Sequence, residues 1–548
     1  MKKFILSLSA MLFAVMAGSA CTNFLVGKKA SKDGSVFISY SADSYGMSGY
    51  LAHFPAAVHQ EGAMRDVYDW DTGVFLGRIP EARVTYNVMG NINEHQVAIA
   101  ETTFGGRPEL VDTTGIIDYG SLMYIALQRS RTAREAIDVM TSLVQEYGYY
   151  SSGESFSIAD PNEVWILELI GKGAKEKGAV WVAVRIPDDC ISAHANQARI
   201  RKFDMKDKEN VRYSKDVVKF ARKMGYYNGS DADFDFAAAY CPADFGGLRY
   251  CDARVWSFFN LFADADMSKY VAWASGDATA EPMPLYFKPK APLSLQDVQR
   301  GMRDHYENTP FDITNDLGAG PYKMPYRISP LSCEVDGKEY FNERPISTFQ
   351  TAFTFVAQLR SFMPNAVGGV MWFGTDDANM VVYTPVYCCA TAVPDCYAKQ
   401  YADPVEFSWK SSFWVFNWVS NMIYPKYSMV IDDMRNVQGE LENGIYELSR
   451  EVEQKALDAV KASPEYAVAM LTDFTCNSAE TVLAEWKKFG EKIIVKYNDF
   501  VVKKEENGKI KRSNTGLVDE IVRPGYPKEF WKKIAEETGD RYLVPAVK

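Results

Sequence analysis

The chain has 548 residues, of which 47% are hydrophobic and 14% aromatic, so it can bury one large core or several. Its 60 Lys and Arg against 71 Asp and Glu give a formal net charge of −11, and without a dense basic tract this balance argues against a nucleic-acid partner. Five His, with neither a CxxC nor an HExxH spacing, give a zinc site little support.

The first 20 residues have the pattern of a signal peptide. Lys2 and Lys3 form a positive start, residues 4–16 are apolar apart from two serines, and Gly18 and Ala20 are small residues where a signal peptidase cuts. Beyond them, no uninterrupted apolar run is long enough to span a bilayer. We therefore expect an exported chain, periplasmic or extracellular, with no transmembrane segment after residues 1–20 are removed.

Cleavage after Ala20 would make Cys21 the first residue. Its thiol would then be a nucleophile beside its own α-amine, which titrates near neutrality and can accept the thiol proton. Two alternatives remain open. Cys21 is either the lipid-modified residue of a lipoprotein, which would anchor the chain, or a small buried residue. The lipoprotein motif has a large aliphatic residue where this chain has Gly18.

The segments that follow predict an α+β fold with largely antiparallel sheets. Alternating and apolar runs bounded by turn residues predict strands over 22–26, 36–40, 96–101, 155–159, 164–170 and 180–186. Thr132 and Glu135 form a capping box at the start of a helix that Gly148 ends. Asp43 comes just beyond the second strand, so the first two strands would hold it near Cys21.

In the second half of the chain, the residue composition changes near residue 437. The aromatic-rich stretch before it predicts a helix over 294–306 and strands over 367–373 and 380–383. Beyond it, charged amphipathic segments dominate, over 437–461 and 478–498, followed by a solvated link over 503–512. We divide the chain into a signal peptide (1–20), a catalytic domain (21–435) and a helical C-terminal extension (436–548).

Nine Cys leave eight if Cys21 is a free nucleophile. An oxidising compartment would permit disulfides, and the candidates are Cys241 with Cys251 and Cys388 or Cys389 with Cys396. The sequence leaves their connectivity open.

Several motifs together resemble the C69 family of dipeptidases, cysteine N-terminal nucleophile (Ntn) hydrolases related to penicillin V acylase and bile salt hydrolase. The resemblance covers residues 21–435. The motifs are Cys21-Thr-Asn-Phe-Leu-Val-Gly-Lys-Lys-Ala-Ser-Lys-Asp-Gly-Ser35, Asn93-Glu-His-Gln-Val-Ala98, Glu154-Ser-Phe-Ser-Ile-Ala-Asp160, Trp165-Ile-Leu-Glu168, His194-Ala-Asn-Gln-Ala-Arg-Ile200, Asp304-His-Tyr-Glu-Asn-Thr-Pro-Phe-Asp312 and Gly374-Thr-Asp-Asp377.

The resemblance implies an αββα sandwich, two antiparallel sheets between helical layers, and cleavage of an amide bond through an acyl-enzyme on Cys21. No metal or organic cofactor is implied. The expected substrates are dipeptides or very short peptides, and assembly into a homo-oligomer stays open. Two other functions remain: an acylase or amidase acting on N-acyl amino acids or conjugated bile acids, and a non-catalytic lipoprotein lipidated at Cys21.

Four residues match catalytic positions of the family. Cys21 is the nucleophile, Asp43 orients its amine, Asn196 donates to the developing oxyanion, and Arg254 stabilises the site electrostatically. Each of the last three has a plainer interpretation: Asp43 as a turn or cap residue, Asn196 as a structural amide, and Arg254 as an ion-pair residue.

The sequence departs from the family pattern at two places. The family often has Arg three residues before the matching Asp, and this chain has Tyr40 there, so a cation that could lower the thiol pKa is missing. The oxyanion Asn of the acylase relatives corresponds to Thr103. A hydroxyl can donate instead, but the oxyanion hole is left partly unassigned.

Overall fold

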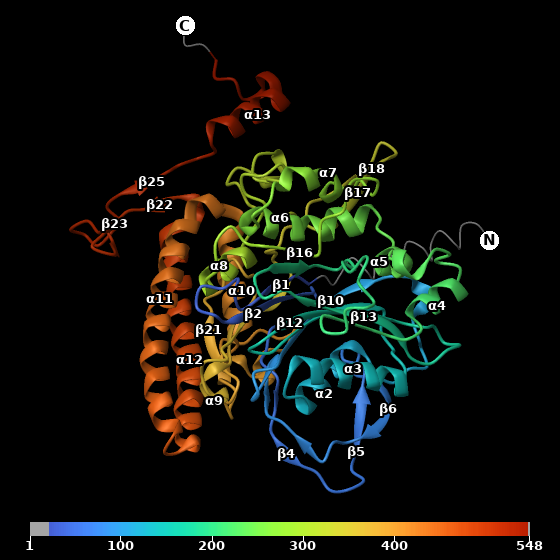
Figure 1. The fold of residues 1–548 in the computed structure, drawn as a ribbon. Coiled ribbons are helices and arrows are strands. Elements are labelled where there is room, and N and C mark those ends of the chain that lie inside the picture. The colour runs from blue at the N-terminus through green and yellow to red at the C-terminus, as the bar shows by residue number, and fades with distance from the viewer. Residues whose placement is uncertain (1–20, 546–548) are drawn as a thin grey trace.

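A computed structural model describes residues 21–545, so the predicted signal peptide lies outside the described residues. Two antiparallel sheets form the centre of the molecule (Figure 1). In sheet order, the seven-stranded sheet consists of β16 (Tyr286–Phe287), β14 (Ile191–His194), β1 (Asn23–Val26), β2 (Val36–Asp43), β19 (Thr351–Leu359), β20 (Val370–Thr375) and β21 (Thr384–Tyr387). The eight-stranded sheet consists of β15 (Val211–Tyr213), β13 (Ala179–Ile186), β12 (Val164–Gly171), β11 (Gly153–Ala159), β10 (Ala98–Gly105), β9 (Ile92–Asn93), β8 (Val88–Met89) and β3 (His53–Phe54).

The two sheets pack face to face, with β2 against β10 and β11. Every residue of β1 and β2 is buried, because the opposite face of their sheet is covered by helices. Side chains of β2 therefore alternate between two buried surroundings. Tyr40 points toward the other sheet, where it meets Glu101, whereas the Ser39 hydroxyl points toward Met302 of a covering helix.

Helices cover the outer face of each sheet (Figure 1). Helices α2 (Tyr119–Arg129) and α3 (Ala133–Tyr147) lie on the eight-stranded sheet; Thr132 caps α3 at its start and Gly148, at φ 80°, ends it. Helices α6 (Ala253–Phe262) and α8 (Leu295–Met302) lie on the seven-stranded sheet. The rings of Phe24 on β1 and Phe258 on α6 stack with their centroids 4.0 Å apart.

Shorter helices and hairpins fill the connections. The short helices are α4 (Val217–Lys223), α5 (Phe236–Tyr240), α7 (Val271–Ala274) and α9 (Asn365–Gly368). The small two-stranded ribbons pair β4 (Ala57–Val58) with β7 (Val84–Thr85), β5 (Met64–Tyr68) with β6 (Phe75–Pro80), β17 (Ser332–Val335) with β18 (Lys338–Phe341), β22 (Val502–Lys503) with β25 (Ile521–Val522), and β23 (Glu505–Glu506) with β24 (Lys509–Ile510).

The C-terminal region is dominated by two long helices, α11 (Tyr427–Val460) and α12 (Pro464–Tyr497), which pack against each other, against the shorter α10 (Ser412–Ile423) and against β21 (Figure 1). The division at residues 435 and 436 falls inside α11. Two buried ion pairs join α11 to the rest of the molecule, Arg303 with Glu442 and Arg360 with Glu453. By contrast, the last helix, α13 (Lys528–Thr538), buries none of its residues.

The structure confirms most of the predicted elements and corrects some. The prediction of a strand over 380–383 is wrong. Its backbone groups bond to side chains of α11 instead of to a strand: Tyr383 N donates to Glu442, and the Val381 carbonyl accepts from Gln438. The predicted strand 367–373 is shared between α9 and β20, and the helix expected over 294–306 ends at Met302.

All nine cysteines lie in the described part of the chain and carry free thiols, so neither candidate disulfide is formed in the structure. Among residues 21–545, no helix combines the length and the apolar character that crossing a membrane requires.

Candidate active site

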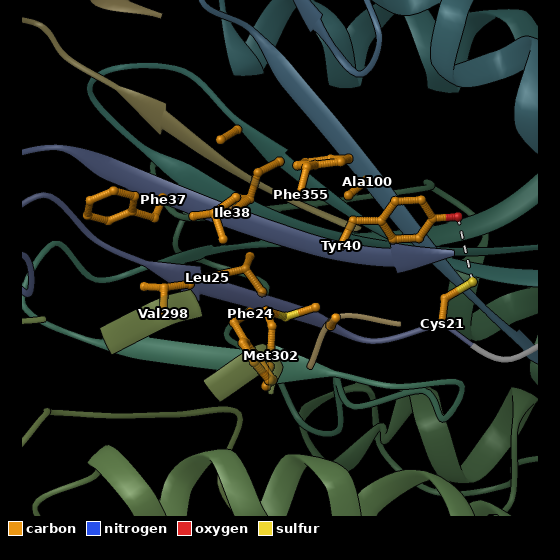
Figure 2. Packing of buried hydrophobic residues seen from close by; sticks show 14 of the residues in the cluster. Cys21, Phe24, Leu25, Phe37, Ile38, Tyr40, Ala100, Val298, Met302 and Phe355 are labelled. Atoms are coloured by element: carbon orange, nitrogen blue, oxygen red, sulfur yellow. Dashed lines mark hydrogen bonds between the residues drawn. The ribbon is translucent and has the colours of Figure 1, made fainter. Parts of the chain in front are cut away.

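Cys21 lies two residues before β1, at the end of the seven-stranded sheet nearest Asp43. Its neighbour Thr22 pairs with Ser41 of β2, which fixes the start of the chain beside the end of that strand. The thiol is buried and points between the two sheets (Figure 2). Its Sγ lies 3.6 Å from Tyr40 Oη and 3.6 Å from Glu101 Oε1.

Tyr40 and Glu101 form a close pair beside the thiol. The Tyr40 hydroxyl on β2 donates to Glu101 Oε1 on β10 at 2.5 Å, so the pair joins the two sheets. Burial, with the neighbouring Cys21 and Glu101, raises the pKa of Tyr40 well above its usual value, so the phenol is neutral. Burial, with the charges of Glu101 and Asp43, also raises the pKa of the Cys21 thiol well above its usual value. The resting thiol therefore keeps its proton.

Asp43, the last residue of β2, is held on its other side by a cation and a hydroxyl. Its carboxylate accepts from Arg344 Nη2 and from Thr351 Oγ1, both at 2.7 Å. Burial raises its pKa, while Arg344 and the Thr351 hydroxyl act in the opposite direction. Its backbone N–H faces the Cys21 thiol and lowers the thiol pKa slightly against the stronger effects that raise it.

Arg254 links the nucleophile to the loop after β14. This fully buried guanidinium projects from α6 and donates to five acceptors: Cys21 O at 2.6 Å, Thr22 Oγ1 at 2.7 Å, Ala195 O at 3.1 Å, Asn196 Oδ1 at 3.0 Å and Tyr250 O at 2.7 Å. Burial and the nearby Arg344 lower its pKa to about 10, so it stays cationic at neutral pH.

Asn196 follows β14 with a left-handed backbone, at φ 62°, which an Asn tolerates better than most residues. Its Oδ1 accepts from Arg254 and its Nδ2 donates to the Thr103 carbonyl at 2.8 Å. One of the two amide hydrogens is therefore engaged, and the other is left for a further acceptor. The Thr103 hydroxyl donates its one proton to Glu154 Oε2 at 3.0 Å, so it has none left to donate to an oxyanion.

The structure thus brings the four sequence-predicted residues together. Cys21, Arg254 and Asn196 belong to one hydrogen-bonded network, and Asp43 adjoins the thiol. Sequence reasoning missed Glu101 and Glu154, and it treated Tyr40 only as a missing cation. The signal for the two glutamates was present, because each is the one charged residue of a buried strand.

A pocket opens onto the thiol. Its lining is rich in aromatic and apolar side chains, among them Tyr50, Trp70, Tyr119, Tyr124, Phe353 and Phe373, and the charged residues in it are Asp43 and Glu101. None of the described residues that line it is Lys, Arg or His. Elsewhere too, residues 21–545 contain no group of three or more His, Cys, Asp or Glu placed to hold a metal ion.

The buried Cys21 thiol thus lies two residues before β1, with Arg254 on its carbonyl oxygen and Asn196 on that Arg. The chain belongs to peptidase family C69, whose sequence model matches residues 20–51 and 46–440. The resemblance drawn from the motifs is confirmed.

Relatives with this sequence pattern carry dipeptidase names. A probable dipeptidase of Salmonella dublin is 29% identical over 408 residues, which cover 71% of this chain and 85% of the relative. A probable dipeptidase of Latilactobacillus sakei is 25% identical over 429 residues, covering 75% and 82%. Dipeptidase A of Lactobacillus helveticus is 24% identical over 458 residues, covering 79% and 86%.

Proposed function

We propose that this protein is an exported cysteine dipeptidase of the Ntn type, with Cys21 as the nucleophile of the mature chain. The observation that carries the proposal is the position of Cys21, whose thiol points into the pocket while Arg254 holds its carbonyl. Membership of family C69 and the names of the relatives support peptide hydrolysis. The helix–sheet–sheet–helix layering agrees with an αββα sandwich.

The proposed reaction begins with a proton transfer. Because the surroundings raise the thiol pKa, attack requires a base, and the α-amine freed by removal of residues 1–20 is the base closest in the chain. Sγ attacks the carbonyl carbon of the substrate, and the free amide hydrogen of Asn196 together with the Asp43 N–H supports the oxyanion. The ammonium of Cys21 returns its proton to the leaving amine. Water, activated by the same amine, then hydrolyses the thioester.

Asp43 and Arg254 are assigned supporting roles in this proposal. A carboxylate at Asp43 would orient the amine and stabilise its protonated form. Arg254 is a positioning residue, since it holds the Cys21 carbonyl and the Asn196 amide in register.

The test compares the mature chain, beginning at Cys21, with a chain that retains residues 1–20. We expect the retained segment to lower kcat/KM for a dipeptide by about 10²–10⁴-fold, the contribution of a positioned general base. Cys21→Ala should abolish turnover with the fold intact, and Cys21→Ser should retain at most a trace. Intact mass identifies each N-terminus. Full activity of an unprocessed, mass-verified chain would overturn the mechanism, and a lipid adduct on Cys21 would favour the lipoprotein.

A further inference from the structure

Two buried glutamates lie side by side in the eight-stranded sheet, and one of them, Glu101, lines the pocket. Glu101 is on β10 and Glu154 on β11, where Glu154 pairs with Thr103, so the two carboxyl groups are diagonal neighbours on one face of the sheet. They are 3% and 0% exposed. Apart from each other, Glu101 Oε2 and Glu154 Oε1 meet no hydrogen-bond partner among residues 21–545.

Such a pair shares one proton, because two adjacent carboxylates cannot both ionise in a buried site. Burial raises the pKa of both groups, and the charge of Glu101 raises the pKa of Glu154 further, well above its usual value. Glu154 therefore holds the proton and donates it in a hydrogen bond to Glu101. Glu101 remains a carboxylate, stabilised by the Tyr40 hydroxyl, and faces the pocket.

The distance of this carboxylate from the thiol suits the α-ammonium group of a bound peptide. The α-nitrogen of the residue being attacked lies two bonds from its carbonyl carbon, about 2.5 Å away. A reacting carbonyl carbon approaches its nucleophile to about 3–3.5 Å. Since Glu101 Oε1 lies 3.6 Å from Sγ, an α-ammonium on that residue falls within hydrogen-bond reach of the Glu101 carboxylate.

We propose that Glu101 binds the α-ammonium of the substrate and selects peptides with a free N-terminus over N-acylated amides. The inference rests on the proposed function. It also explains why the pocket carries carboxylates and, among its described lining, no cationic side chain. An N-acyl amino acid has no α-ammonium on the side of the bond that is attacked, so it would leave the Glu101 charge buried without a counter-charge. A peptide acylated on its α-nitrogen would in addition place that acyl group where the carboxylate lies.

The first experiment uses two substrates of the same size, Ala-Ala and propionyl-Ala, which differ in the amine. The mature protein should prefer Ala-Ala, and Glu101→Gln should reduce that preference about 10–100-fold, the loss of one charge-assisted hydrogen bond. Glu154→Gln is the matched variant: its neutral amide can donate to Glu101 as the protonated acid does, so the preference should remain. Glu209→Gln, on an exposed residue, controls for loss of surface charge.

The second experiment does not depend on hydrolysis. Cys21 is alkylated with 2-bromoethylammonium, iodoacetamide or iodoacetate, its modification is followed by peptide mass, and each rate is divided by that of glutathione. We expect the mature protein to prefer the cationic reagent over iodoacetamide, and Glu101→Gln to lower that ratio of rates about tenfold. Removing the Glu101 charge also changes the thiol pKa, but this change acts on all three reagents and leaves the ratio untouched. Glu101→Asp keeps the charge but moves it away from the substrate by one methylene group, so it should also lower the Ala-Ala preference. This variant can be used if Glu101→Gln does not fold.

The outcomes separate the two proposals. If Glu101→Gln slows both substrates equally and alters all three alkylation rates alike, Glu101 acts on the thiol and the inference is wrong. If neither substrate is hydrolysed but the cationic preference follows Glu101, the pocket assignment stands and the dipeptidase proposal fails. Faster turnover of propionyl-Ala than of Ala-Ala would overturn the inference and favour the acylase.

Discussion

The thiol of Cys21 is surrounded by groups that keep its proton in place. Tyr40 occupies the position where the family often has Arg, and its phenol lies 3.6 Å from Sγ while it donates to Glu101. A fixed cation at this place would lower the thiol pKa. Here burial and the Glu101 charge raise it, and the hydrogen bond with Tyr40 opposes them only in part. The proposed mechanism therefore needs a separate base, and it assigns that role to the α-amine freed by removal of residues 1–20.

Asn196 can be tested separately from the nucleophile. Its free amide hydrogen should act on charge that appears in the transition state, so Asn196→Ala should lower kcat by about 10²–10³-fold with little change in KM. The measurement is steady-state kinetics on a dipeptide. Since the variant also removes an acceptor of Arg254, circular dichroism and melting should establish the folded fraction. A rise in KM alone would make Asn196 a binding residue.

The residues of the site could be predicted from the sequence only where a local motif carries them. Cys21 follows a segment with the pattern of a signal peptide and Asn196 lies in one of the motifs, so both could be proposed from the sequence. The pairing of Glu101 with Glu154 depends on the register of β10 and β11, which a single sequence leaves open. The same register decides the role of Thr103. Its hydroxyl, considered as an oxyanion donor, lies opposite Glu154 and already donates to that side chain.

Among the elements, β14 has an unusual connection to the other sheet. His194, its last residue, is fully buried, with Nδ1 2.7 Å from Thr102 Oγ1 on β10 and Nε2 2.8 Å from Ser157 Oγ on β11. The ring therefore fastens the strand that leads to Asn196 onto the eight-stranded sheet. Burial, with Arg199, lowers the pKa of His194 to about 3, so the imidazole is neutral.

This lowered pKa predicts a stability that depends on pH. Below pH 6.5 the unfolded chain binds a proton at this residue that the folded chain refuses, so the contribution is complete above pH 6.5 and is lost as the pH falls toward 3. By pH 5 the loss is about 2 kcal/mol. Urea unfolding of the mature protein and of His194→Gln at pH 7 and pH 5 measures it. An equal fall in both proteins would contradict the assignment.

Elements with a clear periodic pattern were predicted well. The helix from the Thr132 cap to Gly148 and the strands β11 to β13 lie where the sequence placed them, within two residues. The error at 380–383 has a tertiary cause. That apolar run is buried as a strand would be, but Glu442 and Gln438, about 60 residues later in the chain, supply its hydrogen bonds.

At the scale of the whole molecule, the C-terminal helices are fastened by buried charge. Arg360 donates to both carboxylate oxygens of Glu453, at 2.7 and 2.9 Å, and Tyr387 of β21 donates to the same carboxylate at 3.0 Å. A buried pair adds little net stability over an apolar one, but removing one partner is costly, because the other charge remains buried. The helices therefore belong to the same folded body as the sheets.

A substitution at this contact should weaken the whole fold. Glu453→Gln leaves Arg360 without a counter-charge and should lower the free energy of unfolding by about 3 kcal/mol. Glu451→Gln, exposed and two residues earlier on the same helix, should change it by less than about 0.5 kcal/mol. Urea unfolding curves give both values. If the two variants lose the same stability, α11 does not depend on this ion pair.

The two ends of the described chain differ in how they can be handled in the laboratory. Cys21 is enclosed between the sheets, and any residue joined to it would block the amine that the proposed mechanism requires. Residues beyond α12 are largely exposed, and α13 projects from the body with none of its side chains buried (Figure 1). Affinity handles, fluorescent reporters and surface immobilisation are therefore best placed at the C-terminal end.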